Sequence, residues 1–340
     1  MSKPLNNMEG EYLPIILDNY VTFIDAAFSP NTEHIVLADD MHRLITLDLL
    51  QRRVTKRSTL PAFLVSIKTI GNRLIGCRAD SGLSVISWDQ FTNFNDEFAN
   101  QRPLIDDAHQ TPFAQNCSAV NVVEPLTNKS IVIGCRDGEI RVVNVEANVA
   151  TTVMSKKAHE FQVNELAATS EWTFVSAGMD GVVSSWDIRT NCSTPTQRIE
   201  IAKNPSVARE EFGNNLNCMS VSGEFLVCGG GPQMGVWHLP SSKLVDTIKD
   251  NRTTQIEWHA LELNSDENTF LCGGRGPDLS VFNFTCEQQT TLPIELEAVG
   301  VIKRKQLESN SSLTVVAGES SKVHFVMNQG YTSAIIDTRL

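Results

Sequence analysis

Three residue types that serve together in hydrolases occur near the middle of the chain: His159, Ser176 and Asp180. A nucleophilic serine needs exposure on a strained turn between a strand and a helix, with an oxyanion hole beside it. Ser176 instead lies within a strand-like pattern, four residues before Asp180, which occupies a turn. The spacing therefore argues against hydrolase chemistry and directs attention to the elements around these side chains.

The stretch 158–190 reads AHEFQVNELAATSEWTFVSAGMDGVVSSWDIRT. Apolar and polar residues alternate in it, and Asp180-Gly181 predicts a tight hairpin because both residues tolerate positive φ. Three strands that end in Trp186-Asp187 are the signature of a WD repeat, which is one four-stranded blade of a β-propeller. One blade cannot bury its own faces, so the rest of the chain must supply similar blades.

In WD repeats a His, a Ser, an Asp and a Trp at these spacings form a buried hydrogen-bond network that ties the loops to the strands. We therefore expect a structural tetrad of His159, Ser176, Asp180 and Trp186. A member of such a network that is left without its partner costs about 1–3 kcal/mol. No other unit has the full set, so this unit should be the most regular.

The pattern of three strands recurs through the chain, and at about 40–45 residues per blade the 340 residues fit seven blades. The predicted strands are 24–28, 34–38 and 43–47; 63–70, 73–77 and 83–88; 119–123, 131–135 and 139–145; the stretch above; 216–221, 225–229 and 235–239; 256–263, 269–273 and 279–284; and 296–302, 313–317 and 323–326. The predicted fold class is all-β, a seven-bladed WD-repeat β-propeller over residues 12–340, preceded by a flexible segment of residues 1–11.

Outer fourth strands are expected between these units, for example at 149–154, 198–201 and 244–248. Either 331–337 or 12–20 closes the ring, because an open ring would leave unpaired edges. Two connections, 90–117 and 202–215, are longer than the others. Long loops on a rigid scaffold are common binding sites, although both can also be plain insertions.

Two glycine-rich stretches, 229–232 and 273–277, could in principle hold a phosphate group. A phosphate loop leads into a helix N-terminus and usually carries a following Lys. Both stretches lead into predicted strands and neither has the Lys, so we interpret them as turns between strands.

Arg78, Arg136 and Arg275 occupy turns between second and third strands, which gather on one face of a propeller around the central channel. Guanidinium groups there could bind an acidic partner or phosphate groups. Three nearby acids could equally neutralise them: Asp80, Asp137 and Asp278.

Trp186-Asp187-Ile188-Arg189 resembles the box with which WD-repeat substrate receptors dock onto the adaptor of cullin-RING ubiquitin ligases. Over the stretch 174–189, Asp180, Trp186, Asp187 and Arg189 match that box, whereas Ser185 stands where an apolar residue is preferred. The resemblance makes Arg189 a fourth candidate for partner binding and a ligase receptor the alternative function. An enzyme that uses the central channel would instead require convergent titratable residues near its mouth.

The bulk composition limits the possible partners. The net charge is −12 and the pI is about 5.1, which argues against bulk attraction to nucleic acid or to an anionic membrane. The eight cysteines show neither a metal-ligand spacing nor a disulfide framework. We expect reduced core thiols in an intracellular protein, without metal, cofactor or membrane span.

Three stretches together resemble one family of propellers: 228–242 with its Gly-Gly-Gly-Pro and Trp-His-Leu, 176–190, and 317–331 with its terminal Gly-Tyr. With the overall length and the place of the 198–217 connection, they are similar to the THO complex subunit 6 family. The resemblance is clear over 164–340 and faint before that.

The resemblance implies a nuclear, non-enzymatic scaffold subunit of the THO/TREX assembly, which packages nascent mRNA and passes it to export factors. The implied partners are other THO subunits and mRNA export factors, with RNA reached indirectly through the complex. It implies no catalytic residue, no cofactor and no small-molecule substrate.

Overall fold

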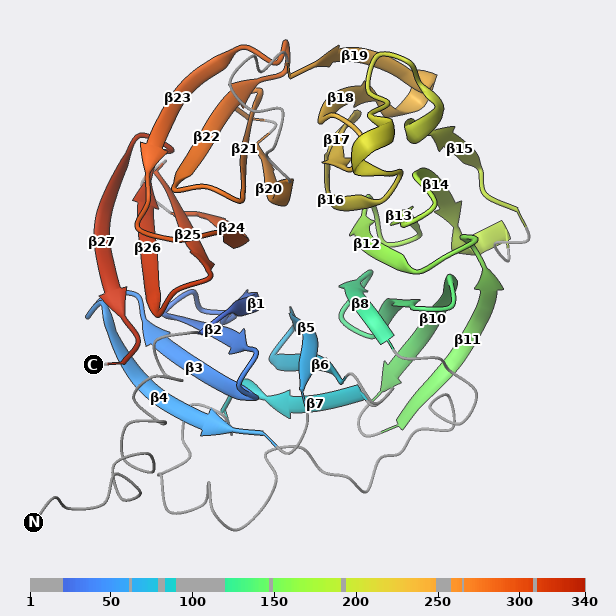
Figure 1. Ribbon diagram of the computed structural model, residues 1–340. Coiled ribbons are helices and arrows are strands. Elements are labelled where there is room, and N and C mark those ends of the chain that lie inside the picture. Colours follow the sequence, from blue (N-terminus) through green and yellow to red (C-terminus); the bar gives the residue numbers. More distant parts are fainter. Residues whose placement is uncertain are drawn as a thin grey trace, which may run out of the picture.

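The computed structural model of the protein describes residues 21–60, 63–78, 83–89, 120–146, 149–190, 194–248, 258–264, 266–307 and 311–339. Seven antiparallel sheets stand side by side around a central axis, as Figure 1 shows. Each sheet consists of strands that are consecutive in the chain, and the first of them lies nearest the axis. The predicted seven-bladed β-propeller is therefore confirmed. The segment 1–11 lies outside the described residues.

Six blades have four strands each, and the second has three in the part of the chain that the structure describes. The strands are β1 Phe23–Phe28, β2 His34–Asp39, β3 Arg43–Asp48 and β4 Arg53–Thr59; β5 Leu64–Ile70, β6 Arg73–Arg78 and β7 Leu83–Ser87; β8 Val120–Pro125, β9 Ser130–Cys135, β10 Glu139–Glu146 and β11 Val149–Lys157; β12 Val163–Ala168, β13 Thr173–Gly178, β14 Val182–Asp187 and β15 Gln197–Glu200; β16 Leu216–Ser222, β17 Phe225–Gly230, β18 Gly235–His238 and β19 Lys243–Thr247; β20 Trp258–Asn264, β21 Thr269–Gly274, β22 Asp278–Asn283 and β23 Gln288–Pro293; and β24 Val299–Gln306, β25 Ser312–Gly318, β26 Lys322–Met327 and β27 Tyr331–Asp337.

Every inner strand has the same irregularity near its start, where one residue is skipped in the pairing with the second strand. In blade 4 the skip lies between Val163 and Glu165, and in blade 5 it lies between Leu216 and Cys218. The other five blades repeat it at the same place. Such a β-bulge increases the local twist of a strand. Because it recurs, it gives a common register in which positions of different blades can be compared.

Buried apolar side chains form seven clusters in the described residues, one at each junction between neighbouring blades. The alternating pattern of each strand places one apolar set against the preceding blade and the other against the following blade. Full burial of a Val, Leu, Ile or Phe side chain contributes about 1.5–3 kcal/mol. The fold is therefore stabilised mainly by contacts between blades.

The two ends of the ring meet between blades 7 and 1 without sharing a strand among the described residues. The predicted outer strand at 331–337 is β27, which forms the outer edge of blade 7. The other candidate for closing the ring, 12–20, lies outside the described residues. A backbone bridge joins Thr22 to Glu319. The Arg57 side chain donates to the carbonyl of Thr338 at 2.6 Å. Closure here rests on lateral contacts between two complete blades.

The inner strand of blade 7 begins later than the predicted 296–302, since β24 covers Val299–Gln306. Leu296 is buried, as is Ile294, although neither belongs to a strand. Both pack into the junction between blades 6 and 7. The connection 294–298 is therefore apolar because it packs between two blades, and for this reason its composition resembles that of a strand.

Six cysteines lie in the described residues, and all six are buried thiols. Cys228 and Cys272 occupy the same position of their second strands, which in blade 4 is the position of Ser176. Cys77 lies one position further along its strand. No helix in the described part of the chain has the length and apolarity needed to cross a membrane.

Candidate functional site

The four residues of the predicted tetrad form a continuous chain of hydrogen bonds in blade 4. Trp186 Nε1 donates to Ser176 Oγ at 2.9 Å. Ser176 Oγ lies 2.7 Å from His159 Nε2, and His159 Nδ1 lies 3.0 Å from Asp180 Oδ1. Because a carboxylate can only accept, the ring proton of His159 is on Nδ1 and Ser176 donates to Nε2. Each group therefore donates to the next, from Trp186 through Ser176 and His159 to Asp180.

The lowered pKa of Asp180 agrees with this direction of donation. Burial by itself would raise the pKa of Asp180, but the hydrogen bond from His159 and those from the backbone N–H groups of Glu160 and Val182 outweigh it and hold the pKa below its usual value. A Cβ on Gly178 would lie 2.5 Å from His159 Nδ1, so the position must be glycine. Ser176 is 0% exposed. The arrangement stabilises the blade and offers no accessible nucleophile.

The triple glycine of blade 5 is explained by the connection 202–215, which packs directly on it. The Arg209 guanidinium donates to the carbonyls of Gly230 and Gly231 at 2.7 and 2.8 Å, and it also lies 4.4 Å above the centre of the Phe212 ring. A Cβ on Gly230 would lie 2.5 Å from the carbonyl oxygen of Asn215. This long connection is therefore a packed cap on blade 5.

Three of the four candidate arginines lie at the same edge of the propeller, at turns between second and third strands. Arg78 ends β6 and is partly buried, whereas Arg136 and Arg275 are exposed. Neither Arg136 nor Arg275 forms an ion pair within the described residues. Arg78 and Arg136 belong to neighbouring blades 2 and 3, but Arg275 belongs to blade 6 on the far side of the ring.

The fourth candidate, Arg189, lies at the opposite edge, in the turn of 3₁₀ helix Ile188–Thr190 (η5) that follows β14. Its side chain is 62% exposed and folds back onto Asp187, with Nη2 2.6 Å from Oδ2. The bond from Arg189 lowers the pKa of Asp187. The structure therefore does not bring the four arginines together on one surface.

A small apolar surface adjoins Arg136 and was missed in the sequence. Phe161 is 53% exposed and Met179 is 48% exposed. The two belong to adjacent segments, because the N–H of Met179 donates to the carbonyl of Gln162 at 2.9 Å. A Cβ on Gly138 would lie 2.4 Å from the carbonyl oxygen of Phe161. The backbone at Phe161 therefore packs against the turn that carries Arg136. We call Arg136, Phe161 and Met179 the blade 3–4 surface.

The charged lining of the central channel is a second feature that was not predicted from the sequence. It includes six charged side chains from the inner strands: Asp25, Lys68, Glu124, Glu165, Glu262 and Lys303. Charged residues inside otherwise apolar strands such as WHALELN were the signal that could have revealed them. Titratable residues do converge here. However, Ser66 donates to Asp25 at 3.0 Å and burial raises the pKa of the Cys218 thiol well above its usual value, so these two lining groups are not activated nucleophiles.

The connection 90–117 lies outside the described residues, as does Asp80. In the described part of the chain, no group of three or more His, Cys, Asp or Glu side chains is arranged to hold a metal ion.

Comparison with known proteins gives a consistent result. The chain is 24% identical over 211 residues to a THO complex subunit 6 homolog of Danio rerio, and the match covers 62% of each chain. It is 26% identical over 205 residues to THO complex subunit 6 of Homo sapiens, covering 59% of this chain and 57% of that protein. It is 30% identical over 210 residues to a THO complex subunit 6 homolog of Rattus norvegicus, covering 61% and 58%. The resemblance indicated by the sequence is thus confirmed.

These matches span less than two thirds of the length of each relative. No protein-family model matches the chain. The relatives are named as subunits of the THO complex, and the described part of this chain folds as a propeller.

Proposed function

We propose that the protein is a nuclear, non-enzymatic scaffold subunit of the THO/TREX complex. In this role it mediates protein–protein contacts during transcription-coupled mRNA processing and nuclear export. Its partners are other THO subunits and mRNA export factors, and RNA is reached through them. The observation that carries the proposal is the similarity to several THO complex subunit 6 proteins, found with a propeller fold.

The surface chemistry is compatible with a docking function. The blade 3–4 surface combines an exposed aromatic side chain, a methionine and an arginine that forms no ion pair with any described residue. Aromatic residues, Met and Arg are enriched where proteins bind each other. The net charge of −12 disfavours direct, non-specific RNA binding. We therefore propose the blade 3–4 surface, rather than Arg189 at the opposite edge, as a contact with another subunit.

Affinity purification of the tagged full chain from nuclear extract, followed by mass spectrometry, tests both statements. We expect THO subunits to co-purify with the wild type. The double variant Arg136→Ala with Phe161→Ala should reduce their recovery severalfold, because truncation of an interface anchor costs about 2 kcal/mol or more. Arg189→Ala is the matched control at the other edge and should leave recovery unchanged. Absence of THO subunits with the folded wild type would refute the assignment.

The ligase-receptor alternative is not favoured, since the similar proteins are named as THO subunits and the Arg189 guanidinium is occupied by Asp187. The same purification addresses it. Recovery of a cullin-RING adaptor that is lost in Arg189→Ala would support the alternative in place of the scaffold function.

A further inference from the structure

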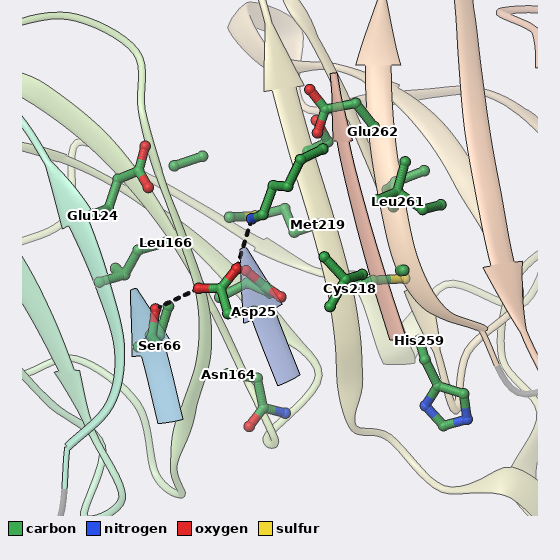
Figure 2. Close-up of a pocket in the computed structure, with 18 of the residues that line it drawn as sticks. Asp25, Ser66, Glu124, Asn164, Leu166, Cys218, Met219, His259, Leu261 and Glu262 are labelled. Carbon is green, nitrogen blue, oxygen red and sulfur yellow. Dashed lines mark hydrogen bonds and ion pairs between the residues drawn. The ribbon is translucent and has the colours of Figure 1, made fainter. Parts of the chain in front are cut away.

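The inner strands of all seven blades enclose a cavity of about 310 Å³ at the centre of the propeller. This is at the lower end of the volume range of small-ligand sites, about 300–1,000 Å³. Figure 2 shows side chains from several strands pointing into this space, among them Asp25, Glu124 and Glu262. The titratable side chains that line it are Asp25, Lys68, Glu124, Glu165, Cys218, His259, Glu262 and Lys303.

Two ion pairs account for part of this charge. Lys303 Nζ lies 2.9 Å from Asp25 Oδ1, and Lys68 Nζ lies 3.4 Å from Glu124 Oε2. Asp25 Oδ2 also accepts from the Ser66 hydroxyl and from the backbone N–H of Ile67. Burial alone would raise the pKa of Asp25, but Lys303, Lys68 and this N–H hold it below its usual value. Both lysines are thus matched by carboxylates of adjacent blades.

The other two carboxylates of the lining have no such partner. The side-chain carboxyl groups of Glu165 on blade 4 and Glu262 on blade 6 form neither an ion pair nor a hydrogen bond within the described residues. Between them stands blade 5, which carries Cys218 at the position equivalent to Glu165. Burial raises the pKa of Glu165 to about 7 and that of Glu262 to about 7. Near neutral pH each group is therefore about half protonated, and Lys68 and Lys303 act on both only from a distance.

We propose that the channel binds a cationic group, an alkylammonium or a guanidinium, at Glu165 and Glu262. Burial disfavours the ionised form of these two carboxyl groups, and a cation that contacts them stabilises that form while it gains charge-assisted hydrogen bonds. The cation could be a free amine or the Lys or Arg side chain of a protein partner, and the chemistry is the same for both.

Other ligand classes fit the cavity less well. An anion would have to displace Asp25 or Glu124 from its lysine, because each lysine of the lining is already paired. A divalent metal ion prefers three or more clustered ligands, and no such group exists in the described residues. The four carboxyl groups of the lining outnumber its two lysines, so the cavity favours a cation over an anion.

Isothermal titration calorimetry of the full chain with propylguanidinium chloride and with butylammonium chloride tests the proposal. We expect saturable binding in the wild type, and at least about a tenfold loss of affinity in the double variant Glu165→Gln with Glu262→Gln. The control variant Glu160→Gln with Glu297→Gln makes the same change of charge at two exposed positions and should bind as the wild type does. No saturable binding by the wild type, or an equal loss in both double variants, overturns the proposal.

A peptide Gly-Gly-Arg-Gly-Gly with blocked ends distinguishes the two sources. Tighter binding of the peptide than of propylguanidinium indicates a side chain of a partner, and the reverse order indicates a free cation. Titration with sodium chloride at the same ionic strength measures the effect of ionic screening, which is subtracted from the effect of each ligand.

The pH dependence supplies a readout that does not need a ligand. Between their usual pKa near 4.5 and the folded value of about 7, Glu165 and Glu262 hold more protons in the folded than in the unfolded chain. The free energy of unfolding should therefore decrease as the pH rises through this window, and the Gln double variant should lose that decrease. A cooperative unfolding transition in these measurements also shows that the Gln double variant folds. An unchanged pH profile in the variant would contradict the desolvated carboxyl groups on which the site depends.

Discussion

Blades 4 and 5 are neighbours with the same strand plan, yet their polar groups are organised differently. Each has a buried tryptophan at the same position of its third strand, paired with the same position of the second strand: Trp186 with Phe174 and Trp237 with Leu226. Trp186 Nε1 donates to Ser176, whereas Trp237 Nε1 has no hydrogen-bond partner among the residues that the structure describes. The difference follows from one residue, because Cys228 stands in blade 5 where blade 4 has Ser176.

The connection that enters each blade is also secured by different chemistry. In blade 4 the His159–Asp180 pair binds the incoming segment to the turn after the second strand. In blade 5 the Arg209 guanidinium binds three backbone carbonyls of the corresponding turn, those of Gly230, Gly231 and Pro232. A motif of four specific side chains is therefore one of several solutions to the same packing problem. The comparison teaches that a blade can lose the motif and keep the architecture.

The largest effect should come from removing the centre of the blade 4 network. His159→Ala breaks the bonds to Ser176 and Asp180 together and leaves both in a largely buried site. We expect a loss of about 2–3 kcal/mol in the free energy of unfolding, measured by urea denaturation. His42→Ala, at an exposed position, is the control. A loss below that of the control would show that the network contributes little to stability.

Arg209→Ala should have the next largest effect, because it removes charge-assisted bonds to the carbonyls of the triple-glycine turn. We expect a loss of about 2 kcal/mol and faster amide hydrogen exchange in 202–215, measured by mass spectrometry. Arg198→Ala, at an exposed position of β15, is the matched control. Unchanged exchange in 202–215 would mean that its packing does not depend on the guanidinium.

The smallest effects should come from exchanging the residue that distinguishes the two blades. Ser176→Cys weakens the acceptor for Trp186 and the donor to His159, so we expect a loss of about 1 kcal/mol. Cys228→Ser offers Trp237 an acceptor, and we expect a change of at most about 0.5 kcal/mol, in the stabilising direction. Thermal unfolding of both variants measures the difference. Equal effects in the two blades would contradict the view that only blade 4 uses this position for hydrogen bonding.

The sequence by itself determined the architecture. Alternating strands and hairpin signals predict seven blades, because these features are local and recur along the chain at about the length of one blade. The spacing of the tetrad likewise indicated which blade would contain it. The apolar connection around Leu296 was assigned to a strand because composition alone does not distinguish a buried loop from a buried strand.

Only the tertiary structure decided which charges meet. Asp25, Glu165 and Lys303 are far apart in the chain, and they line one cavity because the ring brings the first strand of every blade to the axis. The packing of the connection 202–215 on blade 5 likewise joins Arg209 to the triple glycine. Patterns along the chain report how each blade folds, whereas contacts between blades depend on the angle and register at which complete blades pack. For this reason the fold could be read from the residues in order, and the channel could not.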